Sequence, residues 1–413
     1  MSRNRMLWTV IAPFLLMAAS ACAQSNFKTL YKFKDGADGG LPQAGLIFDQ
    51  AGSLYGTAEG GGKGSGVVFQ LVPKSKGGWT QKVLYQFMGG EDGAFPAAGL
   101  IFDPTGSLYS TTAEGGTQNS GTVFQLAPNS DGSWTENPLY SFCSTANCVD
   151  GSTPVSSLVL GSSGALYGTT INGGANQAGV VFQLVPNFDG SWKENVLHSF
   201  CSLANCADGS TPYGNLIFDS VGNLYGTTPT GGTGEGVVFQ LVPNSDGSWT
   251  ENVLHTFTGS EGYDSYGGLI FDHGEQNLYG VTTWGGAYRG GTVFRLRREA
   301  KGNWRHTILH NFCFRKHPFC GDGYQPVKEG LVFDADGNLY GTTFGGGSHN
   351  SGVVFKLTRN PKGGWTDSVL HSFLNAPGAA PVAGVILDSS GNAYGATQGD
   401  NHTTFGSVFE VTP

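Results

Sequence analysis

The chain has 413 residues and a formal net charge of −9 at pH 7, with 22 lysine and arginine residues against 31 aspartate and glutamate residues. This balance argues against nucleic-acid or anionic-membrane partners, because such partners are bound by basic stripes. RLRREAK at 295–301 is a basic run within one repeat, which we interpret as a solvated strand edge. The 67 glycines indicate a chain with many tight reversals.

The first 23 residues are typical of a secretion signal, with two arginines, an apolar stretch and the small residues ACA at 21–23. An alternative is a lipoprotein signal in which Cys22 is acylated, although Ala19 stands where such signals usually carry Leu. No later segment is long and apolar enough for a transmembrane helix. We therefore expect residues 24–413 to be a secreted or otherwise extracytoplasmic bacterial protein.

The rest of the chain repeats one unit seven times. The tripeptide Leu-Tyr-Gly, or a near variant, recurs at intervals of 54, 58, 58, 54, 61 and 54 residues. Its tyrosines are Tyr55, Tyr109, Tyr167, Tyr225, Tyr279, Tyr340 and Tyr394. In the fourth unit, apolar runs at 216–219, 224–228, 237–242 and 249–257 are separated by Gly, Asn and Asp, which predicts four short strands. A period near 50 residues with four strands is typical of β-propeller blades.

The two ends of the chain favour a closed ring over an open stack. The seventh unit ends after three strand-like runs, at 385–388, 393–397 and 407–411. NFKTLYKF at 26–33 matches the fourth-strand sequence VLHSF at 196–200. We predict an all-β, seven-bladed β-propeller of four antiparallel strands per blade, whose last blade is closed by the N-terminal strand. Residues 24–413 would form this single domain, which we expect to be a monomer.

Aromatic residues recur once per blade, and we interpret them as packing elements. A tryptophan opens six of the outer strands, and a histidine or tyrosine stands at a fixed position in all seven. The members are Trp79, Trp134, Trp192, Trp249, Trp304 and Trp365, then Tyr31, Tyr85, Tyr140, His198, His255, His310 and His371. Because these histidines recur by symmetry, we do not assign them as metal ligands, and we expect no metal and no cofactor.

Six cysteines form three local pairs, each in a lengthened connection between blades. The pairs are Cys143 and Cys148, Cys201 and Cys206, and Cys313 and Cys320. An even number of cysteines in an exported protein suggests disulfides, and pairing within each connection is the simplest arrangement. A zinc site is the alternative, but the pairs lie in different blades and lack partners at zinc-like spacing.

In a propeller, the blade-to-blade connections and the loops between second and third strands open on one face, and both vary here. The loop of the fifth blade carries Trp284, Tyr288 and Arg289, which predict stacking on a sugar ring or contact with an anionic group. The alternative for Trp284 is a cover over the channel end. His349 and His402 occupy equivalent loops of adjacent blades, which is a weak catalytic hint.

Acidic residues precede a glycine in six inter-blade connections. We take Asp92, Asp150, Asp208 and Asp322 as candidate ligand-binding residues, because symmetry would gather such carboxylates around the mouth of the channel. The alternative is an Asp-Gly turn repeated by duplication. A second acidic series, with Asp49 as its first member, precedes the first hairpin turn of the blades, and we interpret it as a turn element. No nucleophile–base–acid set is evident, so no catalytic residue is assigned.

LIFDSVGNLYGTT at 216–228 and LVFDADGNLYGTT at 331–343 resemble the GloVer tandem-repeat family of exported bacterial proteins. The resemblance covers nearly all of the mature chain and implies propeller-like repeats, but no established reaction and no catalytic residues. Our first hypothesis is a secreted binding propeller for a glycan or another extracellular polymer. The alternatives are a polysaccharide lyase or glycoside hydrolase that uses acidic residues of the loop face, and a passive cell-envelope or matrix component.

Overall fold

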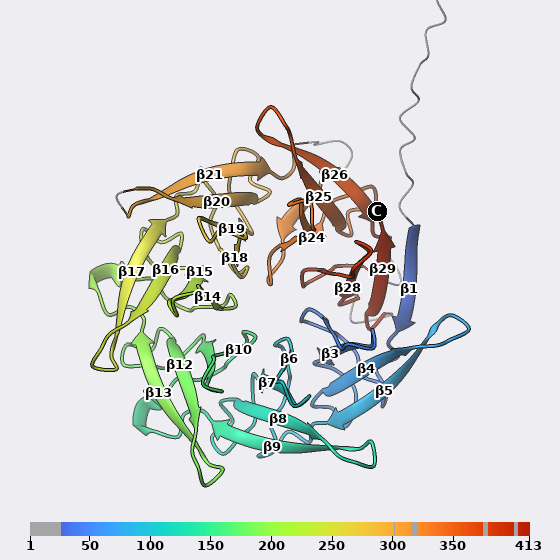
Figure 1. Ribbon diagram of the computed structural model, residues 1–413, viewed down its shortest axis with the longest axis vertical. Coiled ribbons are helices and arrows are strands. Elements are labelled where there is room, and N and C mark those ends of the chain that lie inside the picture. The colour runs from blue at the N-terminus through green and yellow to red at the C-terminus, as the bar shows by residue number, and fades with distance from the viewer. Residues whose placement is uncertain (1–25, 301, 315–319, 375–378, 400–403) are drawn as a thin grey trace, which may run out of the picture.

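The structure is a computed structural model that describes residues 26–300, 302–314, 320–374, 379–399 and 404–413. Seven sheets stand around a central axis like the blades of a propeller (Figure 1). The predicted fold class is therefore confirmed. The expected signal peptide lies outside the described residues, and so does His402.

Each blade contains four antiparallel strands, which follow one another outward from the axis. The inner strands are β2 (Ile47–Phe48), β6 (Ile101–Phe102), β10 (Val159–Leu160), β14 (Ile217–Phe218), β18 (Ile270–Phe271), β23 (Val332–Phe333) and β27 (Ile386–Leu387). The second strands are β3 (Leu54–Ala58), β7 (Leu108–Thr112), β11 (Leu166–Thr170), β15 (Leu224–Thr228), β19 (Asn277–Thr282), β24 (Leu339–Gly345) and β28 (Ala393–Thr397).

The third and fourth strands complete the blades. The third strands are β4 (Val67–Pro73), β8 (Thr122–Pro128), β12 (Val180–Pro186), β16 (Val237–Pro243), β20 (Thr292–Arg298), β25 (Val353–Arg359) and β29 (Ser407–Thr412). The outer strands are β5 (Trp79–Gln86), β9 (Trp134–Ser141), β13 (Trp192–Ser199), β17 (Trp249–Thr256), β21 (Trp304–Asn311), β26 (Trp365–Ser372) and β1 (Asn26–Lys32). Blade six has an additional strand, β22 (Tyr324–Pro326), paired with β24.

The inner strands are shorter than the sequence predicted. The run at 216–219 forms only the two-residue strand β14, because Asp219 already belongs to the turn. Its Oδ1 atom accepts the backbone N–H groups of Val221 at 3.1 Å and Asn223 at 2.8 Å, and its Oδ2 atom accepts the hydroxyl of Tyr225 at 3.0 Å. Asp49 makes the same kind of turn in the first blade. The interpretation of this second acidic series as turn residues is confirmed at these positions.

The ring is closed by the N-terminal strand, as predicted. Strand β1 pairs antiparallel with β29, from Asn26 opposite Thr412 to Lys32 opposite Ser407. Figure 1 shows the blue first strand lying beside the red last strand. Because β1 occupies the place of an outer strand, the seventh blade has a complete set of four strands and covers both of its neighbours.

A pair of phenylalanine rings joins each blade to the next. One ring follows the outer strand of a blade, and the other lies on the third strand of the following blade. The seven pairs meet edge to face, with centroids 4.9–5.2 Å apart. The pairs are Phe33–Phe69, Phe87–Phe124, Phe142–Phe182, Phe200–Phe239, Phe257–Phe294, Phe312–Phe355 and Phe373–Phe409. The first pair joins the N-terminal strand to blade one, so the closure is part of the same core.

The predicted tryptophan packing is also present. Trp249 stands edge-on to Tyr167 of the preceding blade, with centroids 6.3 Å apart, and Trp134 lies in the same way against Tyr55. A glycine follows most of these tyrosines, and Ser110 takes its place after Tyr109. A Cβ atom on Gly226 would lie 2.6 Å from Cζ of Phe239, so a side chain at this position would require the ring to move.

The three predicted disulfides are present: Cys143–Cys148, Cys201–Cys206 and Cys313–Cys320. Each closes the connection between one blade and the next. The first two contain short 3-10 turns, η1 (Ala146–Cys148) and η2 (Ala204–Cys206). Within the described part of the chain, no helix has the length and apolar character needed to cross a membrane.

The closure predicts a specific loss of stability. Replacing Phe33, which is 5% exposed, with alanine removes its contact with Phe69 and leaves a cavity at the ring junction. We expect Phe33→Ala to lower the free energy of unfolding by about 3 kcal/mol, measured by urea denaturation. Phe188→Ala is the matched control, because Phe188 is fully exposed in an outer turn and should leave the midpoint unchanged. Equal midpoints for the two variants would contradict the assigned junction.

Candidate functional site

Two sets of loops share one face of the ring, which we call the loop face. Backbone bridges join the blade-to-blade connections to the loops between second and third strands, for example Ser152 to Asn172, Ser210 to Thr230, and Tyr263 to Trp284. The variable elements singled out from the sequence therefore lie together.

The axial channel is lined by the start of every inner strand and has a volume of about 330 Å³. One residue in it breaks the repeat. Glu329 stands three residues before the inner strand β23, at a position where the other blades carry only small residues. These residues are Ala44, Ala98, Ser156, Gly214, Gly267 and Ala383. Its backbone φ is +71°, a left-handed conformation that is uncommon for a residue with a side chain.

The carboxylate of Glu329 reaches across the channel to other blades. It accepts the backbone N–H of Gly45 in blade one and a hydrogen bond from Ser157 in blade three. Burial raises the pKa of Glu329 to about 7, against the lowering effects of Lys328 and of these hydrogen bonds. The axis thus holds one carboxyl group that is poised between its two protonation states at neutral pH.

Above Glu329, a cavity of about 490 Å³ opens on the loop face. Its lining includes Gln43, Tyr213, Tyr266, Lys328 and Phe344, which we call the axial mouth. The rings of the two tyrosines meet edge to face, with centroids 5.2 Å apart and an interplanar angle of 86°. Phe344 is 44% exposed. The mouth therefore presents aromatic surface to solvent, together with one ammonium group.

The ammonium group of Lys328 is held at the rim by two weak contacts. Its Nζ lies 5.7 Å from the ring centroid of Tyr213 and donates to the carbonyl of Ala97 at 3.4 Å. Burial raises the pKa of the nearby Glu59, and Lys328 opposes that shift. An anionic group entering the mouth would meet a cation that has no short salt bridge in the described structure.

The four aspartates predicted to bind ligand lie elsewhere. Asp150, Asp208 and Asp322 are buried and Asp92 is half-buried, and none of the four lines the axial channel or its mouth as described. Asp150 and Asp208 are 2% and 0% exposed and accept the backbone N–H of Ser144 and Ser202, each at 2.8 Å. Asp92 and Asp322 accept backbone N–H groups in the same way. At these positions the carboxylates stabilise the loops between the blades. Their role in ligand binding stays a prediction.

The aspartates face the recurring tyrosine or histidine of the outer strand. Tyr140 donates its hydroxyl to Asp150 at 2.8 Å, and His198 Nε2 lies 3.4 Å from Asp208. Burial acts to raise the pKa of Asp150, but hydrogen bonds from Thr145, Tyr140 and Ser144 lower it overall. The contact with this acid thus explains why histidine or tyrosine recurs at one position of the outer strand.

A second carboxyl group approaches several of these aspartates from the next blade. Burial, followed by repulsion from the neighbouring aspartate, raises the pKa of Glu136 and Glu194 to about 8 and that of Glu251 to about 7. The Oε1 atom of each is buried without a hydrogen-bond partner in the described structure. At neutral pH, Glu136 and Glu194 are therefore mainly protonated.

Trp284, Tyr288 and Arg289 lie on the loop face but outside the axial mouth. Trp284 is 37% exposed and pairs its backbone with Tyr263, while Tyr288 is 36% exposed with its ring centroid 5.5 Å from that of Phe314. His349 is exposed, with Nδ1 2.8 Å from the hydroxyl oxygen of Ser348. Their predicted ligand-binding role stays a prediction.

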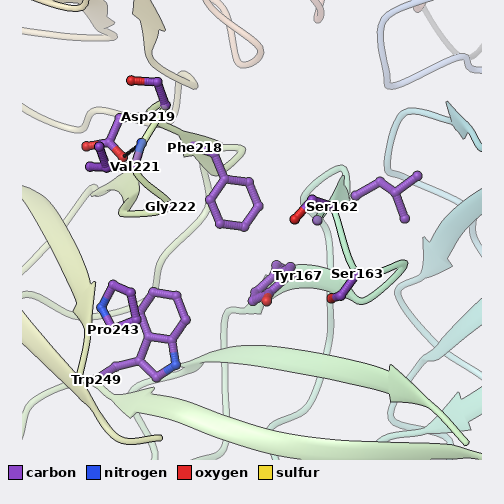
Figure 2. A pocket seen from close by; sticks show the side chains of 12 residues that line it. Ser162, Ser163, Tyr167, Phe218, Asp219, Val221, Gly222, Pro243 and Trp249 are labelled. Atoms are coloured by element: carbon purple, nitrogen blue, oxygen red, sulfur yellow. Dashed lines mark hydrogen bonds between the residues drawn. The ribbon is translucent and has the colours of Figure 1, made fainter. Parts of the chain in front are cut away.

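The opposite face carries inter-blade grooves that belong to the architecture. The groove between blades three and four, about 560 Å³, is lined by Tyr167, Phe218 and Trp249 and by the turn at Asp219 (Figure 2). Similar grooves lie between blades one and two and between blades six and seven. Because this feature recurs with the repeat, it does not single out a site.

The residues of the axial mouth were not identified from the sequence, although a pattern in the repeat marks them. The position four residues before the start of each inner strand varies in an otherwise constant motif. It is occupied by Gln43, Ala97, Val155, Tyr213, Tyr266, Lys328 and Val382. Variation at one register position of a fixed frame is typical of a binding surface.

The fold and the axial mouth define a seven-bladed β-propeller with a solvent-open cavity on its axis. The chain belongs to the Gloeobacter/Verrucomicrobia repeat family, which it matches over residues 18–159 and 133–327. No curated protein matches the chain.

Two solved structures are similar to this chain at 13% sequence identity. One is a candidate 6-phosphogluconolactonase from Bacteroides uniformis ATCC 8492, with a TM-score of 0.52 over 86% of this chain and 89% of that chain. The other is a candidate oxidoreductase (glucose dehydrogenase) from Thermus thermophilus, with a TM-score of 0.42 over 94% of this chain and 100% of that chain. At this identity, the first likeness supports the fold alone.

The protonated glutamates predict an alkaline loss of stability. The folded protein holds the protons of Glu136 and Glu194 up to about pH 8, whereas the unfolded chain releases them near the usual value of 4.5. Their contribution is complete below about pH 4.5 and is lost as the pH rises through about 8. Glutamine is expected to fit, because Gln81 occupies the equivalent position and donates to the carbonyl of Asp38 at 3.0 Å.

The melting temperature of the natural protein should fall between pH 7 and pH 9. In the double variant Glu136→Gln/Glu194→Gln, we expect this fall to be smaller by about 2 °C, a value that discounts the pKa shifts for partial exposure. Differential scanning calorimetry at both pH values measures this difference. Glu114→Gln, at an exposed position, is the control. Parallel pH profiles of the double variant and the natural protein would contradict the assigned protonation.

Proposed function

We propose that this protein is an extracytoplasmic binding propeller whose axial mouth holds one unit of a glycan or another extracellular polymer. The observation that carries the proposal is the composition of the mouth. Tyr213, Tyr266 and Phe344 surround a cavity of about 490 Å³ that also contains the ammonium group of Lys328. Aromatic faces pack against the C–H faces of sugar rings, and an ammonium group suits a carboxylate or sulfate substituent.

Export is part of this proposal. The three disulfides fit an oxidising compartment, and the family match supports an assignment to exported bacterial proteins. The disulfides also brace three of the connections that lead into the loop face. A braced frame lowers the ordering cost of binding, because fewer loop conformations must be given up.

A second candidate function follows from Glu329. A carboxyl group with a pKa raised to about 7 by burial, adjacent in sequence to Lys328 of the mouth, has the properties of a general acid or base. We therefore keep polysaccharide cleavage as the alternative, with Glu329 as the acid in place of the predicted aspartates. Turnover of a polysaccharide panel that Glu329→Gln abolishes would favour the enzyme.

The binding proposal predicts which variants lose affinity. Lys328→Met keeps the aliphatic stem and removes the charge, and Phe344→Ala removes an exposed ring whose loss should not disturb folding. We expect each to weaken binding by about tenfold or more, as is usual for buried contacts at the centre of an interface. The measurement is a glycan and polysaccharide screen of the mature protein, followed by titration calorimetry with the ligands found.

Trp284→Ala is the matched control, because Trp284 lies on the same face outside the mouth. A screen without any ligand would overturn the proposal. Binding lost in Trp284→Ala but retained in Lys328→Met and Phe344→Ala would move the site to the fifth-blade loop.

A further inference from the structure

At the interface of blades four and five, the recurring acid–histidine arrangement acquires another histidine. His255 on β17 and Glu261 in the following connection belong to blade four, and His306 on β21 belongs to blade five. In the described part of the chain, these three form the only group of three or more His, Cys, Asp or Glu residues whose ligand atoms all lie within 4.8 Å of one another. We propose that they bind a divalent transition-metal ion, with Zn²⁺ as the first candidate.

The contacts place both histidines against one carboxylate. His255 Nε2 lies 3.4 Å from Oε2 of Glu261, and His306 Nδ1 lies 3.6 Å from Oε1. Two imidazole nitrogens and a carboxylate oxygen form a donor set that suits Zn²⁺, Cu²⁺ or Ni²⁺ far better than Ca²⁺ or Mg²⁺. Three protein ligands leave a coordination position for water or an exogenous group.

The ring nitrogens of the two histidines are withdrawn from solvent, because both side chains are largely buried at the blade interface. The Nε2 atoms of both are buried and have no hydrogen-bond partner in the described structure.

The surroundings orient the carboxylate and leave a path for entry. The hydroxyl of Thr258 donates to Oε2 of Glu261 at 3.0 Å, and such a hydrogen bond would fix the orientation of a metal-bound carboxylate. The Glu261 side chain is 33% exposed, whereas those of His255 and His306 are 15% and 8% exposed. An ion would reach the group from the loop side, where the carboxylate can move.

The ring geometry must change when the ion binds. The two imidazoles are stacked with centroids 4.4 Å apart and an interplanar angle of 4°. Phe27 stacks on His371 in the same way at 3.9 Å, so the stack itself is a packing feature of this position. Because a metal lies in the plane of each imidazole that binds it, at about 2.0–2.1 Å, the rings must tilt toward each other. The feature special to this interface is that both stacked rings carry nitrogens facing one carboxylate.

The repeat supplies substitutions that are expected to fold. Gln81 occupies the position of His306 in blade one, and Tyr85 occupies that of His255. His306→Gln and His255→Tyr therefore restore residues that this fold already accommodates. His310→Tyr is the matched control, since it makes the same change as His255→Tyr one interface further along.

The test is binding of Zn²⁺, and separately Cu²⁺, to chelator-treated mature protein without a histidine tag, by titration calorimetry and elemental analysis. We expect one ion per chain, a higher melting temperature on Zn²⁺ addition, and at least about tenfold weaker binding in His306→Gln and Glu261→Gln, with His310→Tyr unchanged. Absence of stoichiometric binding of either metal, or binding that His306→Gln leaves intact, would overturn the proposal. Neither outcome depends on a glycan ligand.

Discussion

The edge-to-face contact between two phenylalanine rings, repeated at all seven blade interfaces, is the interaction on which the rest of the structure depends. A four-stranded sheet has two faces to bury, and in a ring each face can be covered only by a neighbouring blade. Phe257 and Phe294 show the arrangement between blades four and five. Since Phe33 of the N-terminal strand makes the same contact with Phe69, closing the ring and packing its core are one event.

This rigid frame leaves only a few register positions free to vary. One position ahead of each inner strand faces the axis, and it carries a glutamine, two tyrosines, a lysine or a small apolar residue, depending on the blade. Glu329 stands one residue further along, where a large acid replaces the small residue of the other blades and spans the channel. The asymmetry of a propeller built from near-identical units is thus concentrated on its axis, where a single side chain reaches several blades.

The blade interfaces show how side chains that pack the fold can also gain chemical properties. Most blades pair the outer-strand histidine or tyrosine with an acid, and a residue of the next blade completes the contact. Where that residue is Glu136, two carboxyls share the space and one keeps its proton. Where it is His306, the same space holds two imidazoles and a carboxylate. Small changes at one register position therefore convert a packing contact into a protonated pair or a metal-ligand set.

The sequence by itself determined the architecture. Seven copies of the Leu-Tyr-Gly strand, the displaced fourth strand at 26–33 and the cysteine pairs are local patterns, which can be interpreted without knowing how the chain folds. The tertiary structure alone decided which side chains meet on the axis of the ring. Tyr213, Tyr266 and Lys328 are separated by 53 and 62 residues in the chain, and only closure of the ring brings them to one mouth. The tertiary structure also buries the carboxylate of Asp208, because the backbone N–H groups of its own loop need an acceptor.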